Sequence, residues 1–257
     1  MQTQYGTKLV FSQQVEEEFR QFLVERAKTL GFSEAKQAFW AQYMTDTTRI
    51  EKVIRQFLDD VDISDHQRHR VLDVGCGFGS SLIALPLYFG QAYGIDTNTA
   101  YVEWAKRRAP QAKVVQADAR AMPWCDDWFD VVFVNDMLEH VNYDDQKCVA
   151  SELMRVLKPG GYGVITVPNR YQVFDEHNRV PFGTWLPPSK RELYVRAISP
   201  NEHFDRCWER TGRGWQRLFE QHGFAVTRKA HYVKGLNALK YLLVPPNRYK
   251  LYLRKPE

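Results

Sequence analysis

The N-terminal part of the chain carries apolar side chains at helical spacing. In residues 12–30, and again in 45–61, these side chains fall on one face of a predicted helix. The aromatic run Phe39–Met44 lies between the two segments, and we expect it to form their connector. The polar segment Ser64–Arg70 ends this region, so residues 1–68 are predicted to be a helical cap.

From residue 71 onward, short β-branched runs alternate with segments of helix length. The runs are 71–74, 92–95, 113–115, 129–134 and 162–167, and the predicted helices lie near 80–89, 100–109 and 145–157. Pro86 predicts a kink or an early end in the first of these helices, and Lys158–Gly161 predicts the end of the last. Apolar strands separated by helices are typical of a parallel sheet covered on both faces.

The pattern is less regular after residue 167. Residues 168–205 are rich in proline, arginine and aromatic residues without a clear period, and we interpret them as an insert. A helix near 215–222 and strands near 224–232 and 249–254 follow, the strands forming an antiparallel pair. The expected fold class is α/β: a doubly wound, seven-stranded, mostly parallel sheet spanning residues 69–257.

Composition narrows the class of protein. The 257 residues are 44% hydrophobic, which is enough for a large core, and no apolar run approaches the roughly 20 residues that span a bilayer. The N-terminus lacks the basic and then apolar layout of a signal peptide. Cys76, Cys125, Cys148 and Cys207 show no C-x-x-C spacing, which favours a reducing compartment, so we expect a cytoplasmic protein.

Positive charge is concentrated at the C-terminal end. Residues 226–257 contain eight Lys or Arg against one acid, whereas the whole chain has a net charge of +4. A basic end can bind phosphates or an anionic surface, and solvated charge on outer strands is the alternative. A short amphipathic stretch for peripheral membrane contact is formed by Lys234, Leu236, Leu239, Lys240 and Leu243.

The first candidate for chemistry is the glycine-rich segment Asp73–Gly79, which follows the first predicted strand. A dinucleotide-binding turn is a competing interpretation, but Ser80 stands where that fingerprint needs its third glycine. Asp73 would also repel a pyrophosphate, and it suits a ligand with a positive amino group. Asp96 ends the next strand, where a carboxylate can accept two hydrogen bonds from a ribose.

Together with these residues, several further motifs occur in the order and spacing of one family. They are Ala117–Ala119, Met122–Phe133, Asn135–Val141 and Leu153–Gly161. Over residues 70–167 the chain resembles the class I S-adenosylmethionine-dependent methyltransferases, in particular the type-11-like enzymes of bacterial small-molecule and glycan tailoring. The resemblance implies the Rossmann-like methyltransferase fold, S-adenosyl-L-methionine as cofactor, and N-terminal helices that act as a lid. Packing of those helices on the core is the alternative.

The resemblance also implies which residues bind the cofactor. Those implied are Asp73, Gly75, Cys76, Gly77, Asp96, Thr97, Asp118, Ala119 and Asn135. Asp73 and the glycine loop would hold the methionine end, Asp96 the ribose, and Asp118 with the Ala119 amide the adenine. Asn135 and Asp136 would face the sulfonium.

Methyl transfer to a hydroxyl requires a group that takes its proton. His177 lies in the insert beyond the fifth strand, where ligands of such sheets bind, and a surface loop histidine is the alternative. His140 is the second catalytic candidate, although it can instead fix its loop. Asp136, Glu139 and His140 are similar in spacing to the metal ligands of some O-methyltransferases, but no further ligand is identifiable, so we assign no metal.

We therefore expect an enzyme that O-methylates a small molecule, a sugar or a lipid-linked acceptor, with the insert at residues 168–205 on the acceptor side. A nucleic-acid acceptor is an alternative, but the Asn/Asp-Pro-Pro-Tyr/Phe signature of base-amine methylation is absent after the fourth strand, where Asn135–Leu138 stands. A non-catalytic protein at a membrane surface is the other alternative. The oligomeric state stays open.

Overall fold

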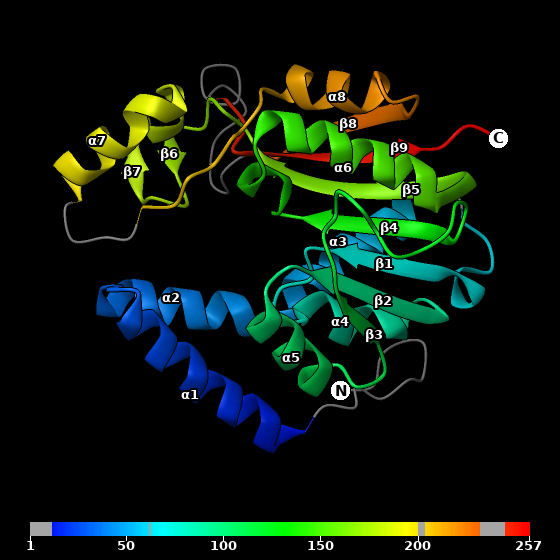
Figure 1. Ribbon diagram of the computed structural model, residues 1–257, viewed down its shortest axis with the longest axis horizontal. Coiled ribbons are helices and arrows are strands. Elements are labelled where there is room, and N and C mark those ends of the chain that lie inside the picture. Colours follow the sequence, from blue (N-terminus) through cyan, green and yellow to red (C-terminus); the bar gives the residue numbers. More distant parts are fainter. Residues whose placement is uncertain (1–11, 62, 200–203, 232–244) are drawn as a thin grey trace.

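The computed structural model describes residues 12–61, 63–199, 204–231 and 245–257 (Figure 1). Its centre is a seven-stranded sheet in the order β3-β2-β1-β4-β5-β9-β8. The strands are β1 (Arg70–Val74), β2 (Gln91–Asp96), β3 (Lys113–Gln116), β4 (Phe129–Asn135), β5 (Leu157–Pro168), β8 (Ala225–His231) and β9 (Arg248–Arg254). Strands β1 to β5 are parallel, and β9 runs antiparallel to its neighbours β5 and β8. The predicted mostly parallel sheet is confirmed.

Helices cover both faces of the sheet (Figure 1). They are α3 (Thr47–Asp60), α4 (Ser80–Ala84), α5 (Thr99–Arg108), α6 (Tyr143–Val156) and α8 (Gly212–Glu220). Alternate side chains of a strand point to opposite faces. Val71 accordingly packs in the core with α3, α4 and α5, whereas Leu72 packs in the core with α6 and α8. Among the described residues, no helix is both long and apolar enough to cross a membrane.

The aromatic run Phe39–Met44 differs from the prediction. It is not a connector, because it lies inside a helix, α2 (Glu34–Thr45). Trp40 and Met44 are one helical turn apart, and both pack against the cluster around Phe78 of the glycine loop. No glycine or proline interrupts this segment, so the run of aromatic residues is compatible with a helix that presents them to the loop.

Two other segments also depart from the expected boundaries. Strand β5 begins at Leu157, so Lys158–Gly161 lies within the strand rather than in a turn between α6 and the strand. Helix α4 ends at Ala84 and continues as a 3₁₀ turn, Leu85–Leu87. This early end is the effect predicted for Pro86, which removes a backbone donor.

The N-terminal helix α1 (Gln13–Thr29) packs on α2 and α5. Its Phe19 is fully buried and lies 5.2 Å, centroid to centroid, from the Trp104 ring on α5. The buried Arg108 guanidinium pairs with Glu16 at 2.7 Å and donates to the Phe78 carbonyl at 2.8 Å. These contacts anchor α1 beside the glycine loop.

The insert after β5 has its own regular structure, although no period predicts it. It contains the short strands β6 (Phe174–Asp175) and β7 (Val180–Pro181) and the helix α7 (Pro188–Ile198). Figure 1 shows it beyond one end of the sheet, on the same side as α2. Arg191 of α7 is buried and pairs with Glu209 at 2.8 Å, which ties the helix to the chain that leads back to the sheet.

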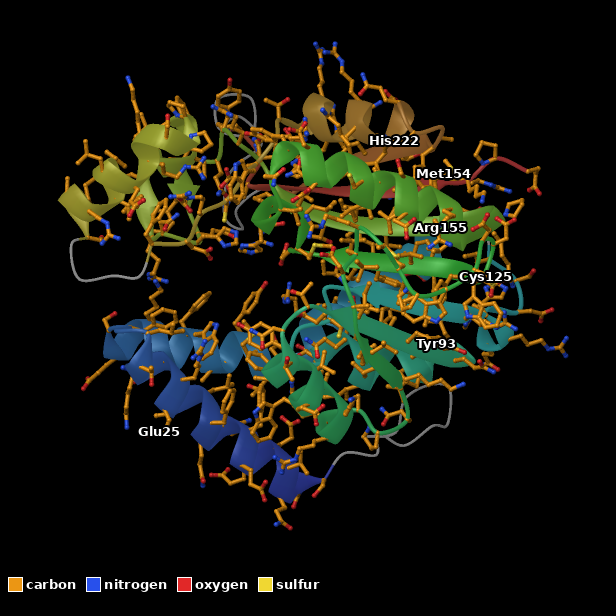
Figure 2. All side chains as sticks on the ribbon, in the orientation of Figure 1. Glu25, Tyr93, Cys125, Met154, Arg155 and His222 are labelled. Atoms are coloured by element: carbon orange, nitrogen blue, oxygen red, sulfur yellow. The ribbon has the colours of Figure 1, made fainter. Side chains whose placement is uncertain are left out.

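The loop between β3 and β4 is held by α6. Figure 2 labels Arg155, which belongs to α6. Its guanidinium donates to the Met122 carbonyl at 3.0 Å and to the Trp124 carbonyl at 2.6 Å. Glu152 pairs with Arg155 at 2.7 Å and also accepts from the Met122 amide. This network fixes the loop that follows the predicted adenine-binding residues.

Several of the C-terminal basic residues are paired within the chain. Lys229 contacts Asp60 at 2.6 Å, Arg248 contacts Glu176 at 2.6 Å, and Lys255 contacts Asp127 at 2.6 Å. This internal pairing favours the interpretation of solvated structural charge over a nucleic-acid surface. The amphipathic stretch around Leu239 lies outside the described residues.

Candidate active site

The glycine loop begins directly at the end of β1. Gly75 and Gly77 have positive φ angles of 72° and 50°, which side chains other than glycine rarely adopt. The turn is closed by the Gly75 and Cys76 amides, which both donate to the Ile95 carbonyl at 2.9 Å. The loop therefore brings its backbone next to the end of β2.

The Asp96 side chain holds the glycine loop next to the end of β2. One carboxylate oxygen accepts from the Gly77 amide at 3.0 Å, and the other accepts from the Asn98 amide at 2.9 Å. The side chain is half-buried and lies at the end of β2, next to Thr97. Each oxygen keeps capacity for a further donor, as recognition of a diol requires.

Asp73 is only 2% exposed at the end of β1. Burial, together with the nearby Asp96 charge, raises the pKa of Asp73 to about 7. Burial also raises the pKa of the Cys76 thiol well above its usual value. Asp73 is thus a carboxyl group whose ionisation a cationic ligand would favour.

The remaining predicted cofactor residues lie at or just after the ends of β3 and β4. Asp118 is held by a two-pronged ion pair with Arg120, whose closest N–O distance is 2.6 Å. Asn135 accepts from the Thr166 hydroxyl at 3.1 Å, whereas its buried side-chain amide nitrogen has no partner in the described part of the chain. Such an unpaired donor favours a ligand at this position.

Asp136, the residue after β4, contacts three side chains from distant segments of the chain. It accepts from the Tyr43 hydroxyl at 2.8 Å and pairs with Arg49 at 3.2 Å and with Arg248. Burial opposes ionisation of Asp136, but the two arginines outweigh it and lower its pKa to about 2. With its carboxylate committed to these partners, Asp136 does not form a metal-binding set with Glu139 and His140.

A cavity of about 730 Å³ lies over these strand ends. All of the predicted cofactor residues line it: Asp73, Gly75, Cys76, Gly77, Asp96, Thr97, Asp118, Ala119 and Asn135. Trp40, Tyr43 and Met44 of α2 line it from the N-terminal side, and His140 and Asp205 line it at another edge. A second cavity, of about 680 Å³, lies around Lys158–Tyr162 and includes none of these residues.

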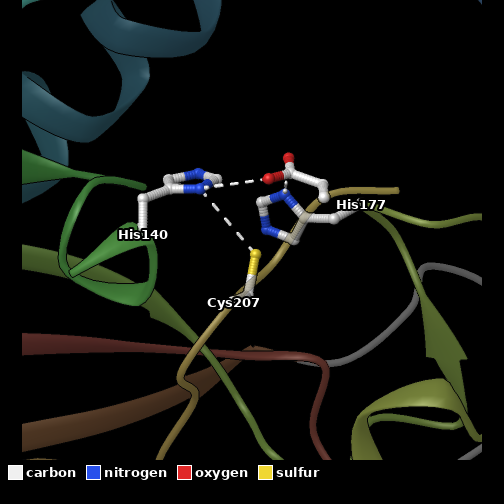
Figure 3. Close-up of side chains that lie close together, drawn as sticks. His140, His177 and Cys207 are labelled. Atoms are coloured by element: carbon white, nitrogen blue, oxygen red, sulfur yellow. Dashed lines mark hydrogen bonds and ion pairs between the residues drawn. The ribbon is translucent and has the colours of Figure 1, made fainter. Parts of the chain in front are cut away.

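The two predicted catalytic histidines meet at the edge of the larger cavity (Figure 3). The rings of His140 and His177 are 5.0 Å apart, centroid to centroid. Asp205 lies between them, 3.5 Å from Nδ1 of His140 and 3.6 Å from Nδ1 of His177. The Sγ atom of buried Cys207 lies 3.8 Å from Nδ1 of His140. We call these four residues the His–Asp–Cys cluster.

Charge and hydrogen bonding set the protonation of the His–Asp–Cys cluster. Burial lowers the pKa of His140 and His177, but Asp205 and Cys207 outweigh it, so the pKa of each histidine lies above its ordinary value. Burial raises the pKa of Asp205, but the two histidines outweigh it and the net shift is downward. Without another cation, the cluster therefore pairs imidazolium with carboxylate.

Several residues of this site were not predicted. They are Tyr43, Arg49, Asp205, Cys207 and Arg248. Each comes from a segment distant from its partner, and none belongs to a recognisable motif. The only signal in the sequence was Cys207 itself, a lone cysteine that follows the polar residues at the end of the insert.

Comparisons with known proteins agree with this geometry. Residues 72–165 match the model of a family described as a methyltransferase domain. An uncharacterised methyltransferase of Synechocystis is 27% identical over 69% of this chain and 76% of its own length. A 2-methyl-6-phytyl-1,4-hydroquinone methyltransferase of Synechocystis is 35% identical over 55% of this chain, a match that spans only 45% of the relative.

The fold has solved counterparts. A structure of an S-adenosylmethionine-dependent methyltransferase from Archaeoglobus fulgidus aligns with a TM-score of 0.58 and 18% identity, covering 85% of this chain and 99% of that one. The family match falls on the segment that carries the glycine loop and the strand ends beneath the cavity. Residues 72–165 are thus a methyltransferase domain, and this protein is an enzyme with S-adenosyl-L-methionine as its cofactor.

Proposed function

We propose that the enzyme transfers the methyl group to a hydroxyl of a small molecule, a sugar or a lipid-linked acceptor. The observation that carries this proposal is the His–Asp–Cys cluster at the edge of the cavity that Asn135 also lines. Asp96 would bind the ribose and Asp118 with Ala119 the adenine, so the sulfonium would come to lie near Asn135. A hydroxyl between the sulfonium and the cluster would be aligned for displacement and could lose its proton there.

Within the cluster, His140 is the residue that faces the cavity. Its side chain is 39% exposed, and Asp205 contacts Nδ1, so Nε2 is the nitrogen left for the acceptor. His177 is more buried, with 15% of its side chain exposed, and supports the same carboxylate from the other side. We assign proton removal to the neutral form of His140, with His177 acting through Asp205. Because the pKa of His140 is raised, this form becomes populated as the pH rises, so turnover should rise with pH.

The aromatic residues of the insert suit an acceptor with an apolar ring. Tyr171, Phe182 and Trp185 of the insert form an exposed aromatic group, with ring centroids 5.2–5.9 Å apart. Arg179 of the insert lies 5.6 Å from the Phe39 ring of α2. We propose that residues 1–68 act as a cap and that the insert, 168–205, bounds the acceptor side. One relative is named for a hydroquinone, which is a ring compound.

Substitution of the histidines tests the proposal. His140→Ala and His177→Ala are expected to lower turnover about 10²- to 10⁴-fold, the usual contribution of a positioned acid–base group. The assay would measure methyl transfer from labelled cofactor to a panel of hydroquinones, phenols, sugars and fatty alcohols. His222→Ala is the matched control, because His222 does not line the cavity and its ring contacts the Leu218 carbonyl of the preceding helix.

Cofactor affinity should stay within about twofold in both variants, because neither histidine contacts the predicted nucleoside-binding residues. Turnover equal to wild type in both variants would contradict a role of the histidines in proton removal. Transfer to amines but to no hydroxyl in the panel would contradict the proposed acceptor class.

The raised pKa of Asp73 predicts that cofactor binding depends on pH. Below a pKa of about 7 this carboxyl is neutral, and above it the group is ionised and can pair with the ammonium of the methionine end. The affinity for S-adenosylhomocysteine should therefore rise about tenfold between about pH 6 and pH 8. Calorimetric titration measures it. Asp73→Asn should bind weakly and with no such rise, and a pH-independent wild-type affinity would contradict this role.

A further inference from the structure

The His–Asp–Cys cluster contains more metal-ligating groups than proton removal requires. Two imidazoles, a carboxylate and a thiol each offer one ligand atom, and these four atoms all lie within 4.8 Å of one another. His140 ends the short turn after β4, His177 lies between β6 and β7 of the insert, and Asp205 and Cys207 come from the segment before α8. Figure 3 shows the labelled side chains converging on one point from these segments.

The spacing of the ligand atoms fits a tetrahedral ion. Zinc lies about 2.0–2.2 Å from nitrogen and oxygen ligands and about 2.3 Å from sulfur, which places ligand atoms about 3.3–3.7 Å from one another. The measured separations from His140 Nδ1 are 3.5 Å to Asp205 and 3.8 Å to Cys207. His177 Nδ1 is 3.6 Å from Asp205. These three separations are close to the edges of such a tetrahedron, although the two nitrogens face different oxygens of Asp205. All four ligand atoms lie within 4.8 Å of one another, so an ion would draw them slightly closer together.

A second observation comes from Glu139. Its side chain is fully buried, and neither carboxylate oxygen has a hydrogen-bond partner in the described part of the chain. One oxygen lies 3.6 Å from Nε2 of His177, which also has no partner there. A metal-ligating histidine commonly donates its other ring N–H to a carboxylate. Binding of a metal at Nδ1 would place that proton on Nε2, facing Glu139.

We propose that His140, His177, Asp205 and Cys207 bind one zinc ion, with Glu139 orienting His177. The mixture of imidazole, thiolate and carboxylate ligands favours a borderline-soft divalent ion over Mg²⁺ or Ca²⁺, which prefer oxygen. The donor set differs from the trio that the sequence suggested, because Asp136 is held by arginines. The ion would link the insert to the loop after β4.

The consequence for catalysis rests on the proposed function. Asp205 is 40% exposed and lines the cavity, so it is the ligand that an acceptor hydroxyl can replace on the metal. A metal-bound hydroxyl loses its proton more readily than a free one, and the released Asp205 carboxylate accepts that proton. The resulting oxygen would then attack the methyl carbon as the carbon–sulfur bond of the cofactor breaks. With zinc bound, the histidines would serve as ligands, and the role of proton acceptor would pass from His140 to Asp205.

The test is zinc binding by the full chain, with any histidine tag removed. Protein stripped with a chelator would be titrated with Zn²⁺ in competition with a chromophoric chelator, and separately with Co²⁺. We expect one ion per chain and a thiolate-to-cobalt charge-transfer band. Cys207→Ser should abolish the band, and His177→Ala should lower zinc affinity at least tenfold. Glu139→Gln should lower it about 10- to 100-fold, as expected for an orienting partner.

Cys148→Ser is the matched control, because Cys148 is an exposed cysteine on α6 and should leave both readouts unchanged. Binding of S-adenosylhomocysteine by each variant would show that it is folded. Zinc affinity that is the same in wild type, Cys207→Ser and His177→Ala would overturn the inference, as would the absence of the band. Zinc binding without transfer to any hydroxyl would instead count against the proposed function. Transfer that is unaffected by removal of all metal would leave His140 as the direct proton acceptor.

Discussion

Replacement of Asp96 by alanine is expected to lower the affinity for S-adenosylhomocysteine about a hundredfold or more. Two hydrogen bonds from ribose hydroxyls to a carboxylate contribute about 1.5–3 kcal/mol each, and 1.4 kcal/mol corresponds to a factor of ten. The variant also loses the acceptor that orients the Gly77 amide, so the glycine loop would be less well fixed. Calorimetric titration of wild type and variant measures the difference.

Glu103→Ala provides the control for this measurement. Glu103 is an exposed acid on α5 that pairs with Lys106 of the same helix and does not line the cavity, so its loss should leave the affinity unchanged. Thermal unfolding of Asp96→Ala would show whether the fold survives. A folded Asp96→Ala protein with wild-type affinity would exclude Asp96 from ribose binding.

The second large effect concerns stability. Arg191→Ala should reduce the free energy of unfolding by about 3–5 kcal/mol, because it leaves the Glu209 carboxylate buried without its partner. Burial already raises the pKa of Glu209 despite the arginine, which shows how costly the isolated charge would be. Denaturant unfolding monitored by tryptophan fluorescence measures the loss.

Two further variants separate charge from packing. Arg191→Met combined with Glu209→Leu removes both charges and should recover most of the stability lost in Arg191→Ala. Arg196→Ala breaks an exposed pair with Glu192 on the same helix and should cost at most about 1 kcal/mol. Equal losses in Arg191→Ala and Arg196→Ala would contradict the importance of burial.

The sheet could be predicted because its signal is local. Each strand from β1 to β5 is a short apolar run bounded by turn residues, and the change from helical to strand pattern occurs at residue 71. Helix α7 was not predicted, because its packing depends on Arg191, a charged residue that becomes buried only through Glu209. A polar residue at a core position hides the apolar period on which prediction relies.

In the candidate site, too, features with a local sequence signal could be predicted and those that depend on tertiary contacts could not. That the glycine loop and Asp96 would line one cavity could be predicted, because they sit at fixed positions at the ends of neighbouring parallel strands. The acceptor side could not, because Asp205 and Cys207 reach the two histidines only through the path of the insert. His140 and His177 were each identified separately, and their contact depends on tertiary structure.

A crystal structure with S-adenosylhomocysteine bound tests the central claim most directly. We predict that the nucleoside lies between Asp96 and Ala119, with the amino group toward Asp73 and the sulfur near Asn135, on the side of the His–Asp–Cys cluster. A product sulfur pointing away from His140, or a nucleoside that binds outside the 730 Å³ cavity, would contradict this account.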